Sequence, residues 1–379
     1  MIHRAKFQNF KALRDVEVTF DSRLTVLVGP NGSGKTSVLQ GIHFFCLGLR
    51  NMPSAFSYLP TTDLMFSREA DGEMVLELGA DLGSEKYRHI RQIVGFRPSG
   101  RDSVTQSMSR TEVAESADAP DEGWMLPPAG VPQRGQLVTW FLRLDPAQLA
   151  AVSIPRPQVF SGIEENGAGF ASVLASLALS DPAKFQVLLR ELRKVIPSVC
   201  GLRVWRVPVQ RADRETVKID GDELVRHVTR DYTGEQLIFD FDRAAGIPAS
   251  MVSEGTLLMA GLLTTILSET GPRVVLLDDI DRGLHPKSQM ELIGVLRKLL
   301  DQFPDLQIIA TSHSPYILDK LQPNEVRVMA LRDDGSAACA RLEDHPKYPM
   351  WKDSMSPGEF WSHGGEDWVK QLTPQTAAP

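Results

Sequence analysis

One stretch decides the class of fold: Leu24-Thr25-Val26-Leu27-Val28-Gly29-Pro30-Asn31-Gly32-Ser33-Gly34-Lys35-Thr36. Its first half is an apolar run typical of a buried strand, and its second half fits the pattern G-x-x-x-x-G-K-[ST] completely. The residues Thr36–Leu49 that follow predict a helix. Strand, glycine-rich turn and helix together are the context in which backbone N–H groups turn inward around phosphate oxygens. The stretch therefore predicts a phosphate-binding loop on an α/β fold.

The side chains of this loop suit a nucleoside triphosphate with Mg²⁺. Lys35 can reach the β- and γ-phosphates, and the Thr36 hydroxyl can ligate the metal. The expected nucleotide-binding residues are Gly29, Pro30, Asn31, Gly32, Ser33, Gly34, Lys35 and Thr36.

A buried strand that ends in two acids follows much later, at Val274–Leu277 with Asp278 and Asp279. Carboxylates at the end of a parallel strand lie at the same edge of the sheet as the loop. We expect Asp278 to hold Mg²⁺ and Asp279 to orient the attacking water beside the γ-phosphate. On its own the pattern is weak, because buried strands often end in Asp at a turn.

Two further motifs can reach the phosphates. The apolar strand within Leu306–Thr311 delivers His313 to the same sheet edge, where it can donate to the γ-phosphate. Ser253 and the Gly255 N–H precede a predicted helix, Gly255–Glu269, whose N-terminus can bind phosphate oxygens. Taken alone, each has a plainer interpretation as a helix cap.

Taken together and in this order, the four motifs resemble those of the ABC-type ATPase heads of the RecF/SMC/OLD group. The opening Phe7–Leu13 and the segment Leu284-His285-Pro286 are also similar to that group. The likeness covers 1–50 and about 250–331. It implies an α/β fold: a P-loop NTPase head of ABC type, with a mixed sheet flanked by helices, an antiparallel β portion and a helical insert. Gly167–Val207 is similar to the insert of small single-head members of these AAA-family ATPases, which lack coiled-coil arms.

The resemblance also implies a function. Cofactors would be ATP and Mg²⁺, and the catalytic residues Lys35, Asp279 and His313. ATP on one loop would be completed by Ser253 and Gly255 of a second copy, giving an ATP-dependent homodimer that acts as a clamp or switch. Such proteins belong with DNA repair or anti-phage defence. The partners expected are therefore DNA and a separate effector or nuclease protein.

Two departures from the family pattern leave alternatives open. Asp279 stands where the family usually carries Glu, and a shorter side chain favours a low-turnover regulatory or sensor module. The glutamine loop has three candidates, Gln133, Gln136 and Gln148. The opening segment and the His285-Pro286 pair speak against a transporter subunit. A small-molecule kinase would leave Ser253 and His313 without a role.

Composition divides the chain into five parts. They are 1–97 with the phosphate-binding loop, 98–135, an insert at 136–249, 250–343 with the remaining motifs, and a tail at 344–379. Segment 98–135 is rich in Ser, Asp, Glu, Pro and Gly, and we expect a mobile loop there.

Charge and hydropathy limit the classes of protein to which the chain can belong. The net charge of −7 argues against a dedicated nucleic-acid binder. Arg203, Arg206, Arg211 and Arg214 form a local cluster, which is either a basic groove or a solvated strand face. No apolar run approaches the ~20 residues that span a bilayer, so we expect no membrane contact. No secretion signal is visible, and the three cysteines are far apart, so we expect a cytoplasmic protein.

Overall fold

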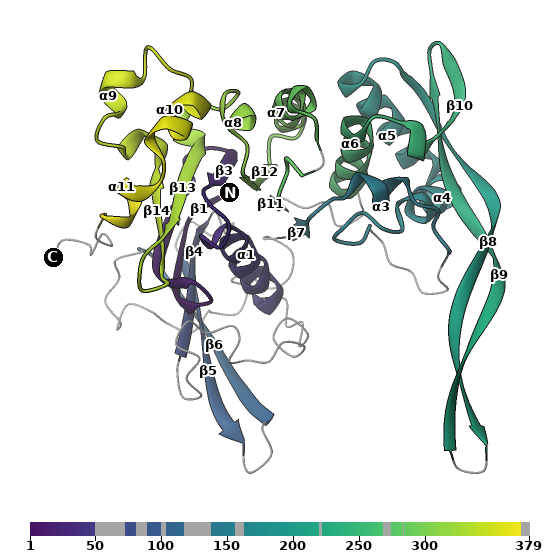
Figure 1. Cartoon of the computed structure of the whole chain (residues 1–379), viewed down its shortest axis with the longest axis horizontal. Coiled ribbons are helices and arrows are strands. Elements are labelled where there is room, and N and C mark those ends of the chain that lie inside the picture. The colour runs from purple at the N-terminus through teal and green to yellow at the C-terminus, as the bar shows by residue number, and fades with distance from the viewer. Residues whose placement is uncertain are drawn as a thin grey trace. The chain divides into compact units, whose positions relative to one another are not determined.

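The computed structural model describes residues 1–49, 73–80, 89–99, 104–116, 138–155, 163–219, 222–267, 274–282 and 284–372. It divides into two compact units (Figure 1). The first combines Met1–Leu142 with Pro272–Pro379, and the second is Arg143–Gly271. The motifs predicted together in 250–343 fall into both units, since the division lies at Gly271.

The first unit contains a mostly parallel sheet that carries the phosphate-binding loop. Its strand order is β14-β13-β3-β12-β11-β7, and only β14 runs antiparallel to its neighbour. The central strands β3, β11 and β12 are completely buried, which explains why they read as continuous apolar runs. The bounds are β3 (Leu24–Val28), β7 (Thr139–Leu142), β11 (Val274–Leu277), β12 (Gln307–Ser312), β13 (Val326–Leu331) and β14 (Ala337–Arg341).

A second, antiparallel sheet in this unit has the order β2-β1-β4-β5-β6. Its last strand, β6, lies inside the segment 98–135 and pairs with β5 from Ser99↔Val104 to His89↔Ala114. The predicted loop is therefore wrong over β6, and 117–135 lies outside the described residues. The bounds are β1 (Ile2–Phe10), β2 (Leu13–Thr19), β4 (Glu73–Ala80), β5 (His89–Ser99) and β6 (Val104–Ala114).

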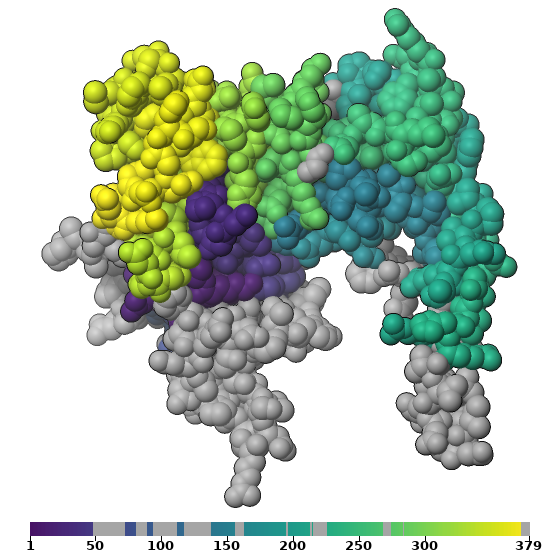
Figure 2. All heavy atoms as spheres, in the orientation of Figure 1, coloured from purple at the N-terminus to yellow at the C-terminus, as the bar shows by residue number. Residues whose placement is uncertain are grey.

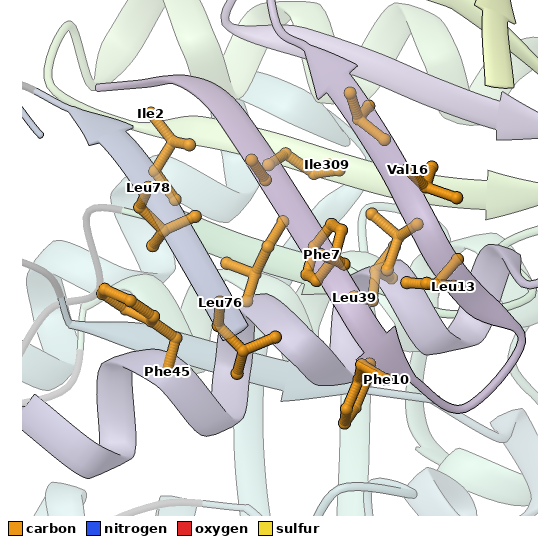
Figure 3. Packing of buried hydrophobic residues seen from close by; sticks show 14 of the residues in the cluster. Ile2, Phe7, Phe10, Leu13, Val16, Leu39, Phe45, Leu76, Leu78 and Ile309 are labelled. Atoms are coloured by element: carbon orange, nitrogen blue, oxygen red, sulfur yellow. The ribbon is translucent and has the colours of Figure 1, made fainter. Parts of the chain in front are cut away.

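The helix α1 (Lys35–Leu49) and both sheets of the first unit share one core. In Figure 3, Phe7 of β1, Leu76 of β4 and Leu39 of α1 lie in one packed cluster, with Ile309 of β12 behind them. All four side chains are at most 1% exposed. Burial of aliphatic and aromatic side chains at this level stabilises each by roughly 1.5–3 kcal/mol. The core therefore fixes both ends of the phosphate-binding loop.

The described part of the tail at 344–379 packs on the parallel sheet of its own unit and on α8. Helix α10 contacts α8, and α11 contacts β13 and β14. The Asp319 carboxylate accepts from the Gly358 N–H at 3.0 Å and from the Ser356 hydroxyl at 2.6 Å, which anchors the start of α10. The remaining helices of the unit are α7 (Pro286–Gln302), α8 (Pro315–Leu318), α9 (Tyr348–Trp351), α10 (Pro357–Gly364) and α11 (Asp367–Lys370), with short 3-10 turns at Pro323–Glu325 and Leu342–Asp344.

The second unit joins a helical cluster to a long hairpin. The helical insert that the resemblance implied contains α4 and α5; Asp181 caps α5 by accepting from the Lys184 N–H at 3.0 Å. Strands β8 and β9 pair antiparallel as one long two-stranded hairpin. The bounds are α3 (Pro146–Ala150), α4 (Phe170–Ser180), α5 (Pro182–Val195), α6 (Glu254–Ile266), β8 (Val199–Ile219), β9 (Asp222–Phe241) and β10 (Ala244–Pro248), with a 3-10 turn at Ala249–Met251.

Among the described residues, no helix has the length and apolar character needed to cross a membrane. Of the three cysteines, Cys46 is buried, and Cys200 and Cys339 are half-buried.

Candidate nucleotide site

The phosphate-binding loop is shaped by its contact with β13. Gly29 has a φ of 145°, in the region that favours glycine. A Cβ added there would lie 2.1 Å from the Met329 carbonyl oxygen. That oxygen belongs to the backbone of a paired strand and cannot move aside, so only glycine fits between the loop and β13.

Lys35 lies buried beneath the loop. Its Nζ donates to the carbonyls of Gly29 at 3.0 Å and Pro30 at 2.8 Å. Burial lowers the pKa of this ammonium group, while the carboxylates of Asp279 and Asp278 raise it. The lysine is thus held by loop carbonyls and surrounded by acids, the environment expected for a cation that meets phosphate.

The Ser33 hydroxyl is fully buried in the loop, and its Oγ has no hydrogen-bond partner within the described residues. Leaving a buried hydroxyl without a partner costs about 1–3 kcal/mol. An oxyanion bound in the loop would provide one.

Asp278 connects the loop to the neighbouring strands. Its Oδ1 accepts from the Thr36 hydroxyl at 2.9 Å and from the Thr311 hydroxyl at 2.8 Å. Carboxylate and hydroxyl oxygens are ligands that Mg²⁺ accepts, so Thr36 and Asp278 fit the metal predicted for them. Their proximity follows from the sheet order, which places β3, β12 and β11 side by side.

Thr311 was not predicted as a site residue. It occupies β12 level with Asp278, because Leu277 of β11 pairs with Ala310. Its hydroxyl donates to Asp278 and accepts from the Asp279 N–H at 2.8 Å. One hydroxyl therefore orients both acids, a role that depends on strand register and is invisible in the sequence.

Thr311→Val should test this role, because valine keeps the shape and removes the hydroxyl. We expect turnover of Mg-ATP to fall about tenfold or more, since losing a hydrogen bond to a charged group costs about 1.5–3 kcal/mol. The measurement is steady-state phosphate release. Thr311→Ser retains the hydroxyl and should keep most of the activity; equal rates for the Val and Ser variants would contradict the role.

Asp279 and His313 lie next to each other beyond these strands. The His313 Nε2 is 3.8 Å from the Asp279 Oδ1, and the His313 N–H donates to the Asp281 carboxylate at 3.1 Å. Asp279 has a φ of 51°, a conformation that Asp tolerates better than most residues. The sequence reasoning missed Asp281, which fixes the backbone that carries His313.

Ser253 and Gly255 belong to the second unit, whereas the other predicted site residues lie in the first. Ser253 is the N-cap residue of α6, yet its hydroxyl bonds the Thr256 hydroxyl at 2.8 Å and caps no backbone N–H. Ser253 is exposed, and a Cβ on Gly255 would meet nothing. The start of α6 is therefore accessible. Of the glutamine candidates, Gln133 and Gln136 lie outside the described residues, and Gln148 is exposed on α3.

A glycine loop between a buried parallel strand and a helix, with an acid on a nearby strand, defines a P-loop nucleotide-binding protein. Comparison with known proteins shows which P-loop proteins the chain is similar to. The family described as "AAA domain, putative AbiEii toxin, Type IV TA system" matches residues 150–319, and the family described as "AAA domain" matches residues 4–122. The chain is 30% identical over 124 residues to Septu protein PtuA of Bacillus mycoides, covering 31% of this chain and 17% of that protein.

It is 48% identical over 105 residues to the DNA double-strand break repair Rad50 ATPase of Methanopyrus kandleri, covering 27% of this chain and 10% of that protein. The chain thus spans no more than about a sixth of the length of either relative. A crystal structure of the Smc head domain bound to the C-terminal domain of ScpA, from Pyrococcus furiosus, matches 93% of this chain and 99% of its own, with a TM-score of 0.50 and 12% identity. That structure supports the fold alone. The site and the two AAA-domain matches together support a P-loop nucleotide-binding protein that resembles the ABC-type heads of the RecF/SMC/OLD group.

Proposed function

We propose that this chain binds Mg-ATP and hydrolyses it to ADP and phosphate. The observation that carries the proposal is the Asp278 carboxylate, which bonds both Thr36 of the loop and Thr311 of β12. This contact links the loop to the acidic end of the sheet. Positioning is the main contribution a protein makes to phosphoryl transfer.

The roles of the individual residues follow from their places. Thr36 and Asp278 would hold Mg²⁺, which when bound neutralises charge on the β- and γ-phosphates. The Lys35 ammonium would leave the loop carbonyls for the phosphate oxygens. Asp279 would accept a hydrogen bond from the attacking water and orient it, and His313 would donate to the γ-phosphate.

We further propose that ATP joins two copies head to tail. Ser253 and Gly255 lie at an exposed helix N-terminus, and the Ser253 hydroxyl is not engaged in capping the helix. A helix N-terminus attracts anions. In the resembled architecture, the γ-phosphate of a second copy is the anion that this surface meets.

A role in DNA repair or in defence against foreign DNA fits this switch best. One relative in part of its length is named for double-strand break repair. A dimer that forms with ATP and opens on hydrolysis can report or clamp DNA for a separate effector or nuclease protein. DNA and this effector are the partners we propose.

A low-turnover sensor is the second candidate, and Asp279 favours it. Its carboxylate is one methylene shorter than the Glu usual in the family. The Asp279→Glu variant discriminates the two functions through steady-state phosphate release with Mg-ATP. We expect turnover to rise roughly tenfold, about 1.4 kcal/mol in the barrier, because the longer side chain brings the carboxylate closer to the water. A rate at or below that of the parent would show that Asp279 already suffices and would contradict the sensor.

A further inference from the structure

The described part of the tail reaches the edge of the parallel sheet that carries the phosphate-binding loop. The loop follows β3, whose neighbours in the sheet are β12 on one side and β13 on the other. Helix α10 contacts α8, which begins at Pro315, shortly after β12 ends at Ser312, and α11 contacts β13 and β14. Arg332, directly after β13, donates to the Leu372 carbonyl at 3.1 Å. Both helices therefore lie near the carboxyl ends of the strands that flank β3 (Figure 1), and Figure 2 shows the yellow atoms of the tail against the green atoms of the segment before it.

The two residues between these helices, Gly365 and Glu366, form what we call the tail link. Because α10 lies on the β12 side of β3 and α11 on the β13 side, the link passes from one side of the phosphate-binding loop to the other. The His345 ring lies 4.9 Å from the Phe360 ring of α10 and 4.9 Å from the Trp368 ring of α11. The Trp368 indole N–H donates to the Gly365 carbonyl at 3.2 Å. Packing of the two helices thus defines the position of Glu366.

The carboxylate of Glu366 acts on Lys35, the lysine of the loop. Burial lowers the pKa of Lys35, while nearby carboxylates raise it, those of Asp279, Asp278, Asp281 and Glu366. The first three follow β11 directly, whereas Glu366 comes from the tail. Glu366 is half-buried, and within the described residues its carboxylate forms no hydrogen bond or ion pair. Its negative charge is therefore not taken up by an ion pair and acts on the loop.

A bound nucleotide brings its own negative charge to the same lysine. The lysine of such a loop meets the β- and γ-phosphates of ATP but only the β-phosphate of ADP. A carboxylate within electrostatic reach of Lys35 repels both nucleotides, and it repels ATP more because the γ-phosphate carries the additional charge. Half-burial of Glu366 reduces the screening of this repulsion by salt. The tail link thus opposes a triphosphate more than a diphosphate.

We propose that Glu366 is a specificity-determining residue that lowers the affinity of the nucleotide site for ATP relative to ADP. The proposal rests on the proposed function, since it assumes that Mg-ATP binds at the phosphate-binding loop. It assigns the tail a role in the nucleotide site, because the fraction of chains that hold ATP depends on where the tail places its carboxylate. Displacing the tail link relieves the repulsion and raises the affinity for ATP.

Isothermal calorimetry of the full chain with Mg-ATP and with Mg-ADP tests the proposal. Glu366→Gln keeps the size of the side chain and removes its charge. We expect its affinity for ATP to rise about fivefold and its affinity for ADP to rise about twofold or less, the size expected for one partly screened charge near the phosphates. The gain for ATP should shrink at high salt. Glu366→Asp retains the charge and should keep the parent's ratio of ATP to ADP affinity.

The matched control is Asp367→Asn, which removes an equal charge from the adjacent residue. The Asp367 side chain is 88% exposed and is paired with Lys370 at 2.6 Å, so both affinities should stay within about twofold of the parent. An equal gain for ATP and ADP in Glu366→Gln, or the same gain in Asp367→Asn, would overturn the role of Glu366. A parent that binds both nucleotides, together with an unchanged Glu366→Gln, would overturn this role alone. A parent that binds neither nucleotide would overturn the proposed function and this role with it.

Discussion

Asp279→Asn should form a dimer in Mg-ATP that persists, and adding Ser253→Arg should abolish it. Asparagine cannot accept a proton from or orient the water as the carboxylate does, so ATP remains between the two copies. Arginine at the exposed start of α6 puts bulk where the second copy's phosphate is proposed to lie. Light scattering with and without Mg-ATP measures the mass. We expect doubling for Asp279→Asn and the monomer mass for the double variant.

Two controls separate a blocked interface from a damaged fold. Ser180→Arg places the same side chain on an exposed position of α4 in the same unit and should leave the dimer intact. Ser253→Arg alone should bind ATP nearly as the parent does but lose turnover. Normal hydrolysis by Ser253→Arg, or no ATP-dependent mass change in Asp279→Asn, would mean that the site is complete within one chain.

Lys35→Ala should lose at least tenfold in ATP affinity, about 1.4 kcal/mol or more. The ammonium is buried, and loop carbonyls and nearby acids surround it. Its removal takes away the cation that meets the phosphates and frees two carbonyls that point into the site. Isothermal calorimetry on the full chain gives the affinity.

The control for this variant is Lys298→Ala, which removes an exposed lysine from α7 in the same unit. It should bind ATP as the parent does. Calorimetry with ADP adds a second comparison. Because ADP lacks the γ-phosphate, Lys35 has one phosphate partner fewer, and the loss of affinity in Lys35→Ala should be smaller for ADP than for ATP. An unchanged ATP affinity in Lys35→Ala would remove the basis for the nucleotide site.

The helices and strands that the sequence predicted are those whose apolar residues recur with a single regular spacing. The predicted bounds of strand β11 match the structure, and those of α1 differ by one residue. In both elements the order of apolar residues along the sequence is enough to indicate which side chains are buried. Strand β6 was missed because polar residues dominate its sequence, Val-Thr-Gln-Ser-Met-Ser-Arg-Thr-Glu-Val-Ala. Its structure comes from backbone pairing with β5, which composition does not encode.

The candidate site residues could be named from contiguous motifs, but their contacts depend on strand register. The Thr36 hydroxyl donates to the Asp278 carboxylate. The bridging hydroxyl of Thr311 and the Met329 carbonyl behind Gly29 depend on which strands are neighbours and how they are aligned. No local sequence pattern indicates which strands are neighbours. The positions of the tail helices likewise depend on the strands against which they pack.

The contact between Gly29 and β13 has a consequence for the protein during its synthesis. The loop is synthesised early, but Thr36 forms a hydrogen bond with Asp278, which is 242 positions later. The carbonyl group that lies against Gly29 belongs to Met329, which is later still. On the ribosome, the loop is therefore made long before the strands that shape it. A nascent chain has no finished nucleotide pocket until β13 has left the exit tunnel and paired with β3. The core that α1 and the antiparallel sheet share with β11, β12 and β13 is likewise incomplete until those strands have been made.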